Sequence, residues 1–166
     1  MNVKVAVMQL QGRTFMSPIE CPFRAADRIL NKLDPDTKVI IVDFHAEATS
    51  EKITLAHYLD GRVSAIVGTH THVQTADAQI LPKGSAYITD IGMTGPYNSA
   101  VGMDIEVSTK RFTSQTPHRY IVAEGNIRIS GIQIMVDEIT GLATSIDNFV
   151  FPSYNKVATN NINEQI

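Results

Sequence analysis

Three histidines follow two short apolar runs of the sequence. His45 comes shortly after the run 39–42, and His70 and His72 come shortly after the run 65–67. Branched apolar runs of this length are typical of buried parallel strands. The carboxyl ends of parallel strands meet at one edge of a sheet, and this edge is where open α/β folds bind their ligands. We therefore expect the three imidazoles to share one site.

The types of these residues favour a metal. Side chains alternate along an extended segment, so His70 and His72 are predicted to point the same way. Three converging imidazoles without a cysteine indicate a catalytic metal site with open positions rather than a closed structural site. Asp43 lies two residues before His45, on the same face of the predicted strand. Its carboxylate would either orient a ligating imidazole or act as an ordinary strand-end cap.

Other polar residues have ordinary explanations. His57 and His118 are interpreted as hydrogen-bonded structural residues. The loop 90–96, with two glycines and a proline, fits either an active-site loop or a common turn. Acids near the start of a helix are favoured by its dipole. We therefore assign no special role to the charged residues at the start of the second predicted helix, Glu47, Glu51 and Lys52.

Composition bounds the class of protein. The chain has 166 residues, a formal net charge of −3 and 43% hydrophobic residues, which is typical of one globular domain. Without a basic surface, nucleic acid is not an expected partner. No apolar run approaches the ~20 residues of a membrane-spanning helix, and residues 1–10 lack the pattern of a signal peptide. The one cysteine, Cys21, cannot form an internal disulfide, so we expect a cytoplasmic protein.

The order of apolar patterns and turn residues predicts an α/β fold. Strands are expected at 3–10, 38–44, 63–69, 79–81 and 86–89. Helices are expected at 22–33, 50–60 and 103–112. Thr49 is the expected N-cap of the second helix, and Gly61 its C-terminal cap. A helix-length crossover joins the second and third strands, so they are expected to be parallel.

The second half of the chain has a different pattern. Segments 119–124, 126–136 and 142–149 are expected to form an antiparallel meander, with turns at 125–126 and 137–141. Residues 1–150 are assigned to one domain. Residues 151–166 are polar and rich in asparagine, and we expect them to form a disordered tail.

Four longer stretches resemble a known family: LQGRTF at 10–15, DFHAEATSEK at 43–52, GTHTHVQTAD at 68–77 and ILPKGSAYITDIGMTGPY at 80–97. They are similar to bacterial calcineurin-like metallophosphoesterases of the 2′,3′-cyclic-nucleotide phosphodiesterase type, and the resemblance runs from about Val3 to Phe149. It implies a four-layer α/β/β/α sandwich around a centre of two iron, manganese or magnesium ions.

The same resemblance implies roles for the histidines. His45 and His70 look like ligands of one metal, and His72 looks like a ligand of the other. Two such ions lie about 3.5–4 Å apart and activate a bridging hydroxide for in-line attack on phosphorus. The proposed general acid of the family is a histidine of an Asn-His pair, and this sequence has no matching pair.

The sequence also departs from the family pattern. Family members begin with a further segment that carries an aspartate in a Gly-Asp turn, a Glu-Asn pair with the bridging carboxylate, and the Asn-His pair. None of these motifs is present here, so we expect this chain to be the C-terminal portion of such a protein, without the N-terminal strands of the sandwich. The incomplete sheet would expose its edge and apolar surface, which favours association into a homo-oligomer.

Charge is the chemical difficulty of the incomplete site. Three neutral imidazoles do not offset two divalent ions, and a bridging carboxylate normally does so. The carboxylates that could replace it in part are Asp43, Asp77 and Asp90.

Three functions remain open. The first is a metal-dependent hydrolase of a small-molecule phosphoester, a 2′,3′-cyclic nucleotide or a related compound, weak or inactive as this chain alone. The second is a self-sufficient hydrolase with one zinc bound by His45, His70 and His72. The third is a non-catalytic remnant that binds a metal or a partner subunit.

Overall fold

A computed structural model describes residues 3–153. These residues form two compact units, and the assignment of residues 1–150 to one domain stays a prediction. The first unit contains residues 3–92 and 132–148, and the second contains residues 93–131 and 149–153.

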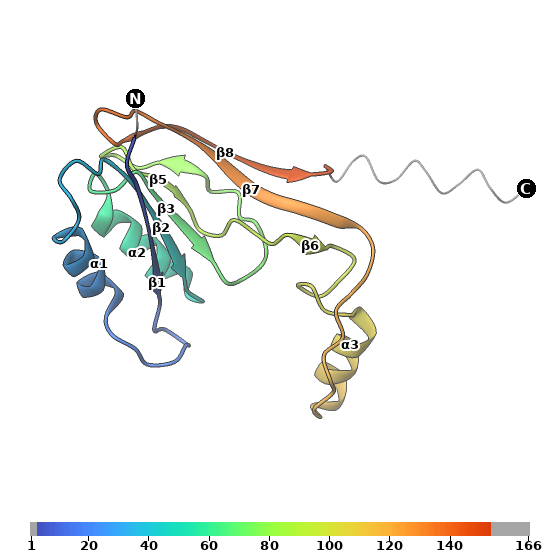
Figure 1. Ribbon diagram of the computed structural model, residues 1–166. Coiled ribbons are helices and arrows are strands. Elements are labelled where there is room, and N and C mark those ends of the chain that lie inside the picture. The colour runs from blue at the N-terminus through green and yellow to red at the C-terminus, as the bar shows by residue number, and fades with distance from the viewer. Residues whose placement is uncertain (1–2, 154–166) are drawn as a thin grey trace, which may run out of the picture. The chain divides into compact units, whose positions relative to one another are not determined.

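The first unit is built on a five-stranded sheet with the order β1-β2-β3-β5-β4 (Figure 1). Its strands are β1 (Val5–Gln11), β2 (Val39–His45), β3 (Ala65–Thr69), β4 (Gln79–Ile80) and β5 (Ala86–Ile88). Strands β1, β2, β3 and β5 are parallel to their neighbours, and β4 is antiparallel to β5. The predicted α/β class and the predicted parallel pair are confirmed.

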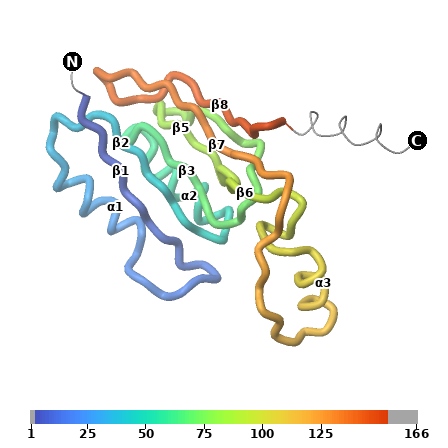
Figure 2. The backbone as a smooth tube through the Cα atoms, turned by 45° about the vertical axis from the view of Figure 1, so that its right-hand side comes forward, coloured from blue at the N-terminus to red at the C-terminus, as the bar shows by residue number. Residues whose placement is uncertain are grey.

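Helices α1 (Pro22–Leu30) and α2 (Thr49–Leu59) lie on one face of this sheet (Figures 1 and 2). Burial alternates along β2, where Ile40, Val42 and Phe44 face the main core. That core also receives Leu55 and Leu59 of α2, both fully buried. The opposite face of β2 is only partly buried and carries His45 at its end.

The ends of both helices differ in part from the prediction. Helix α1 begins at Pro22 as expected but ends at Leu30. The predicted last turn is absent because the chain closes a tighter turn there, in which the Lys32 amide bonds the Ile29 carbonyl. Helix α2 includes Thr49, and Ala48 is its N-cap, so the predicted cap is wrong. Gly61 follows α2 with φ +79°, as expected of a C-terminal glycine.

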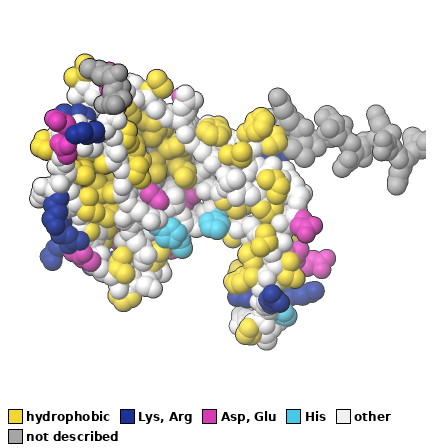
Figure 3. Space-filling model, in the orientation of Figure 1, with side chains coloured by type: hydrophobic (Ala, Val, Ile, Leu, Met, Phe, Trp, Pro, Cys, Tyr) yellow, Lys and Arg dark blue, Asp and Glu magenta, His cyan; other side chains and the backbone are white. Residues whose placement is uncertain are grey.

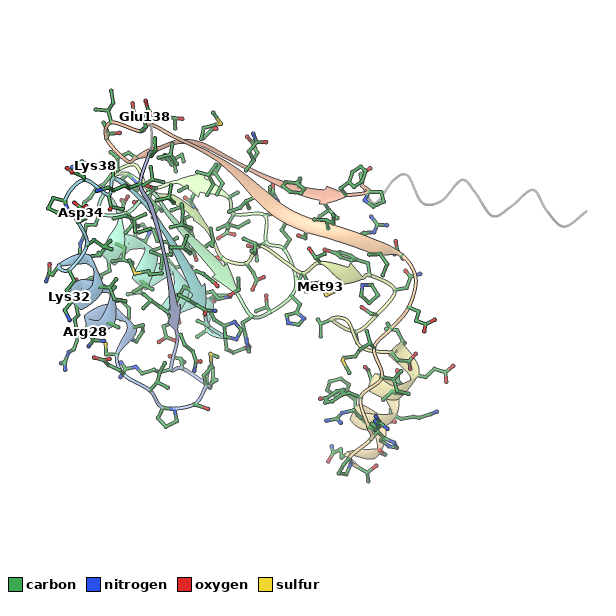
Figure 4. All side chains as sticks on the ribbon, in the orientation of Figure 1. Arg28, Lys32, Asp34, Lys38, Met93 and Glu138 are labelled. Atoms are coloured by element: carbon green, nitrogen blue, oxygen red, sulfur yellow. The ribbon has the colours of Figure 1, made fainter. Side chains whose placement is uncertain are left out.

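The other face of the five-stranded sheet packs against part of β7 (Ile127–Val136) and β8 (Ala143–Phe151). Small residues allow this approach: Ala65, Ala86 and Ala143 are buried together. A turn joins β7 to β8, and Glu138 lies on it (Figure 4). In that turn the Asp137 carboxylate accepts hydrogen bonds from two following amides, as predicted for a turn at 137–141.

The second unit contains β6 (Gly95–Pro96) and α3 (Ile105–Ser114). The Asp104 carboxylate caps α3 by accepting from the Val107 amide at 2.9 Å. Of the predicted meander, the pairing of 126–136 with 142–149 is confirmed, because β7 and β8 are neighbours in a three-stranded sheet. The strand predicted at 119–124 is wrong, because β6 is the other neighbour of β7 and Val122 makes only an isolated bridge. The predicted tail also starts too early, since β8 extends to Phe151. The rest of the predicted tail, 154–166, lies outside the described residues.

Strand β1 lies at the edge of the five-stranded sheet. Two of its exposed side chains are apolar, and Val5 and Val7 are 57% and 73% exposed. Hydrophobic side chains are accordingly visible over this part of the first unit in Figure 3. The expected apolar edge is therefore present, whereas association between copies stays a prediction. Within residues 3–153, none of the helices has the length and apolar character needed to cross a membrane.

A glycine fixes the approach of β3 to the chain after β5. A Cβ atom on Gly68 would lie 1.7 Å from the carbonyl oxygen of Thr89. We expect Gly68→Ala to lower the free energy of unfolding by about 3 kcal/mol or more, since backbone must move. The control is Gly125→Ala, where the added Cβ meets no other atom but φ is +74°. There only the backbone conformation is unfavourable, so the free energy of unfolding should fall by about 1–2 kcal/mol. Urea unfolding of both variants tests this, and equal losses would contradict it.

Candidate functional site

Two of the three predicted histidines meet at the edge of the sheet. His45 ends β2 and pairs in register with Thr69, the last residue of β3, so His70 follows beside it. His45 Nε2 and His70 Nδ1 are 3.0 Å apart. Their rings are nearly perpendicular, with centroids 4.7 Å apart. The strand-end argument therefore predicted this pair correctly.

A carboxylate lies on the other nitrogen of the second ring. Glu47 Oε2 is 3.0 Å from His70 Nε2, and both side chains are partly exposed. The sequence alone indicated no special role for Glu47, but in the structure its carboxylate contacts His70. The local reason is the short turn between β2 and α2, which keeps Glu47 close to the end of β2.

The segment after β3 is not extended. His70 and His72 have φ values of 108° and 67°, a region that non-glycine residues rarely adopt. The predicted alternation of side chains from His70 to His72 is therefore wrong. His72 is exposed. Within residues 3–153, no three His, Cys, Asp or Glu side chains are grouped as a metal site, so a site shared by all three histidines stays a prediction.

Asp43 reaches His45 through a hydroxyl group. Thr69 Oγ1 donates to Asp43 Oδ1 at 2.9 Å and lies 3.4 Å from His45 Nδ1. The carboxylate, hydroxyl and imidazole thus form a row at the ends of β2 and β3. This row is one way in which Asp43 can orient His45, and its effect on a bound metal remains a prediction.

The end of β1 is tied to the same edge. The Gly12 amide donates to the carbonyl oxygen of His45 at 2.9 Å. Glu51 accepts hydrogen bonds from the amides of Arg13 and Thr14, so this acid of α2 has a role that the sequence did not assign. A pocket of about 260 Å³ lies here, and its lining residues are Gln9, Leu10, Gln11 and His45.

A buried ion pair supports the turn His70–His72, which we call the histidine turn. Lys52 Nζ and Asp90 Oδ2 are 3.1 Å apart, and both side chains are fully buried. Asp90 also accepts from the amide and hydroxyl of Thr71 at 2.9 and 2.7 Å, and from the Gly92 amide at 2.9 Å. The view of Lys52 as an ordinary helix-opening residue is therefore wrong, and Asp90 is committed to these partners.

The Asp77 carboxylate also accepts hydrogen bonds from neighbouring residues. It accepts from the hydroxyl groups of Thr75 and Thr89 at 2.6 and 2.5 Å, and from the Thr89 amide. Burial raises the pKa of its carboxyl, but these hydrogen bonds outweigh burial, and the net pKa is lowered. Thr89 also bonds the hydroxyl of Tyr87, whose pKa burial raises to about 12.

The distance within the histidine pair is compatible with two ligands of one metal ion, and metal binding stays a prediction. Ligand nitrogens at about 2.0–2.1 Å from zinc, with ordinary bond angles, lie about 2.9–3.4 Å from each other. The separation of His45 Nε2 and His70 Nδ1 is 3.0 Å. Without a cation, a ring N–H of one histidine donates a hydrogen bond to the ring nitrogen of the other. Imidazole nitrogen with carboxylate oxygen suits zinc, iron and manganese, and the remaining positions need donors beyond this pair.

The family follows from comparison with known proteins. A family model described as YmdB-like protein matches residues 1–149. The chain belongs to this family. It is 54% identical over 147 residues to the 2′,3′-cyclic-nucleotide 2′-phosphodiesterase of Bacillus subtilis (strain 168). The match covers 89% of this chain and 56% of that protein.

Two crystal structures share the fold. One is of a hypothetical protein from Thermus thermophilus, with a TM-score of 0.83 and 45% identity over 87% of this chain and 56% of that chain. The other is of a novel phosphatase from Mycoplasma pneumoniae, with a TM-score of 0.80 and 37% identity over 87% of this chain and 52% of that chain. The chain thus spans about half the length of the relatives it matches.

The lowered pKa of Asp77 predicts a pH-dependent loss of stability. Because the folded pKa is below the ordinary value of 3.8, the stabilisation is present above that pH and is lost as pH falls through the folded pKa. We expect Asp77→Asn to cost about 1–2 kcal/mol at pH 7. Urea unfolding of both proteins from pH 7 to pH 3 should show this difference shrinking. A difference that does not change with pH would contradict the charged hydrogen bonds.

Proposed function

We propose that this chain contributes to a metal-dependent phosphodiesterase that hydrolyses a 2′,3′-cyclic nucleotide or a related small phosphoester. The observation that carries the proposal is the 3.0 Å approach of His45 Nε2 to His70 Nδ1 at the ligand-binding edge of an α/β sheet. The 54% identity to a 2′,3′-cyclic-nucleotide 2′-phosphodiesterase supports the substrate class.

In this proposal, His45 and His70 would hold one divalent ion and His72 would help to hold a second, with iron, manganese or magnesium as the metals. The chemistry that such ions would supply is the activation of a water molecule for in-line attack on phosphorus and the neutralisation of charge on the phosphoryl oxygens. The chain itself orients the donors: Thr69, which bonds Asp43, lies 3.4 Å from His45 Nδ1. The substrate would enter the pocket beside His45, where the side-chain amides of Gln9 and Gln11 can donate to phosphoryl oxygens.

Charge sets the expected activity of the chain alone. Near the histidine pair, Glu47 is the carboxylate in contact with a ring nitrogen, while Asp77 and Asp90 are engaged with other partners. One carboxylate does not neutralise two divalent ions. We therefore propose that residues of the full-length relatives beyond the matched half complete the site, and that the isolated chain turns over slowly.

Metal content tests the ligands. We expect His45→Ala and His70→Ala each to lower zinc or manganese affinity at least about 10-fold, since each removes a nitrogen donor. The matched control is His57→Ala, an exposed histidine on α2, which should bind metal as the unchanged chain does. Isothermal titration with each metal measures this. Equal affinity in all three variants would exclude the histidine pair as the site.

Hydrolysis of 2′,3′-cyclic AMP tests the reaction. With manganese or iron present, cleavage of the bond from phosphorus to O2′ should give the 3′-phosphate and a free 2′-hydroxyl, which chromatography separates from the 2′-phosphate. The reaction should fail with His70→Ala. If the chain, supplied with the part of the Bacillus subtilis relative that it does not match, shows no metal-dependent hydrolysis, the proposal is wrong.

Stoichiometry separates the alternatives. One metal per chain with hydrolysis lost in His70→Ala would favour a single-zinc hydrolase, which the one close histidine pair also fits. Two metals per chain would exclude that alternative. Metal binding without turnover on any phosphoester would instead indicate a non-catalytic metal-binding or partner-binding protein.

A further inference from the structure

The histidine turn has a conformation that it cannot hold by itself. His70 and His72 both have positive φ values, 108° and 67°. Non-glycine residues in such conformations are strained, and they persist when the surrounding structure fixes them. Thr71 lies between the two histidines, so its hydrogen bonds decide which way their backbone turns.

One carboxylate accepts both hydrogen bonds that Thr71 donates. The Thr71 amide and hydroxyl donate to Asp90 Oδ2 at 2.9 and 2.7 Å. The other oxygen, Oδ1, accepts from the Gly92 amide at 2.9 Å. Asp90 therefore joins the histidine turn to the backbone that follows β5.

A buried lysine contacts this carboxylate. Lys52 Nζ donates to Asp90 Oδ2 at 3.1 Å, and both side chains are fully buried. Removing one partner of such a buried pair leaves an uncompensated charge in the core. Lys52 comes from α2, so the pair connects that helix to the turn. Among the described residues, no hydrogen bond or ion pair joins either side chain to the rings of His45 or His70.

We propose that the buried Lys52–Asp90 pair positions the His70–His72 turn and thereby sets the affinity of the histidine site for a divalent cation. The affinity part of this inference rests on the proposed function, whereas the positioning part does not. Lys52 and Asp90 are positioning residues that act through Thr71.

The first test changes the connection and leaves the ion pair in place. Thr71→Val removes the hydroxyl donor. It keeps the size of the side chain, the hydrogen bond from the backbone amide to Asp90 and all histidines. We expect the zinc affinity to fall about 10-fold while the melting temperature changes little. A purely structural pair predicts no change in affinity for this variant.

The second test removes both buried charges together. In the double variant Lys52→Met with Asp90→Asn, no unpaired charge is left in the core, so the protein should fold. Asparagine has one carbonyl oxygen and cannot accept from both Thr71 and Gly92. We expect a folded protein by circular dichroism with a zinc affinity lowered about 10- to 100-fold.

The control makes the same chemical change in another buried carboxylate. Asp60 is 5% exposed and accepts from the amides of Lys83 and Ser85. Asp60→Asn should lower the melting temperature and leave zinc affinity unchanged. If zinc affinity follows melting temperature across all variants, Asp60→Asn included, the positioning role is wrong.

A metal-free measurement keeps the two proposals separate. Amide hydrogen exchange by NMR should be faster at Thr71 in the double variant than in the unchanged chain, and equal in both proteins at Val67 within β3. Unchanged exchange at Thr71 would overturn the positioning role. If the unchanged chain binds no zinc, manganese or iron, the proposed function fails, and the exchange result alone decides the positioning role.

Discussion

The buried attraction between Lys52 and Asp90 is the constraint on which the sheet edge depends. Both side chains are removed from water, at a cost that a close contact of 3.1 Å offsets. Such pairs contribute little net stability compared with apolar residues of the same size. What this pair provides is position: one carboxylate joins helix α2, the turn after β3 and the chain after β5.

The remaining contacts at this edge fix the positions of His45 and His70. Gly68 allows β3 to approach the carbonyl of Thr89 more closely than any side chain permits. On the other side, the Gly12 amide holds the carbonyl of His45. His45 is thus fixed from β1 and His70 from the chain after β5. Parallel strands in register then bring the two rings together.

The sequence was informative where a pattern is local. The apolar runs located β2 and β3, and Pro22 located the start of α1. The extended conformation predicted for His70 to His72 was wrong because bonds from Thr71 to Asp90, far along the chain, set it. Helix α2 does carry a local signal for Lys52. Lys52 occupies the same helical stripe as Leu55, Ala56 and Leu59, which are all buried, and a lysine on that stripe requires a buried anion.

The identity of that anion could not be read from the sequence. Asp43, Asp77 and Asp90 are all acids near predicted strand ends. The structure separates them: Asp43 faces Thr69, Asp77 bonds Thr75 and Thr89, and Asp90 pairs with Lys52. These choices depend on which strands become neighbours and on their register. Spacing along one sequence does not contain that information.

The separation of the ion pair along the chain has a consequence for folding. Lys52 and Asp90 are 38 residues apart, so they meet after β3 and β5 have been brought together, and until then each charge stays hydrated. We expect the turn that holds His70 to become ordered late. In zinc fingers the metal drives folding. Here a metal would arrive at a nearly finished scaffold, so a partly folded chain would bind cations only weakly.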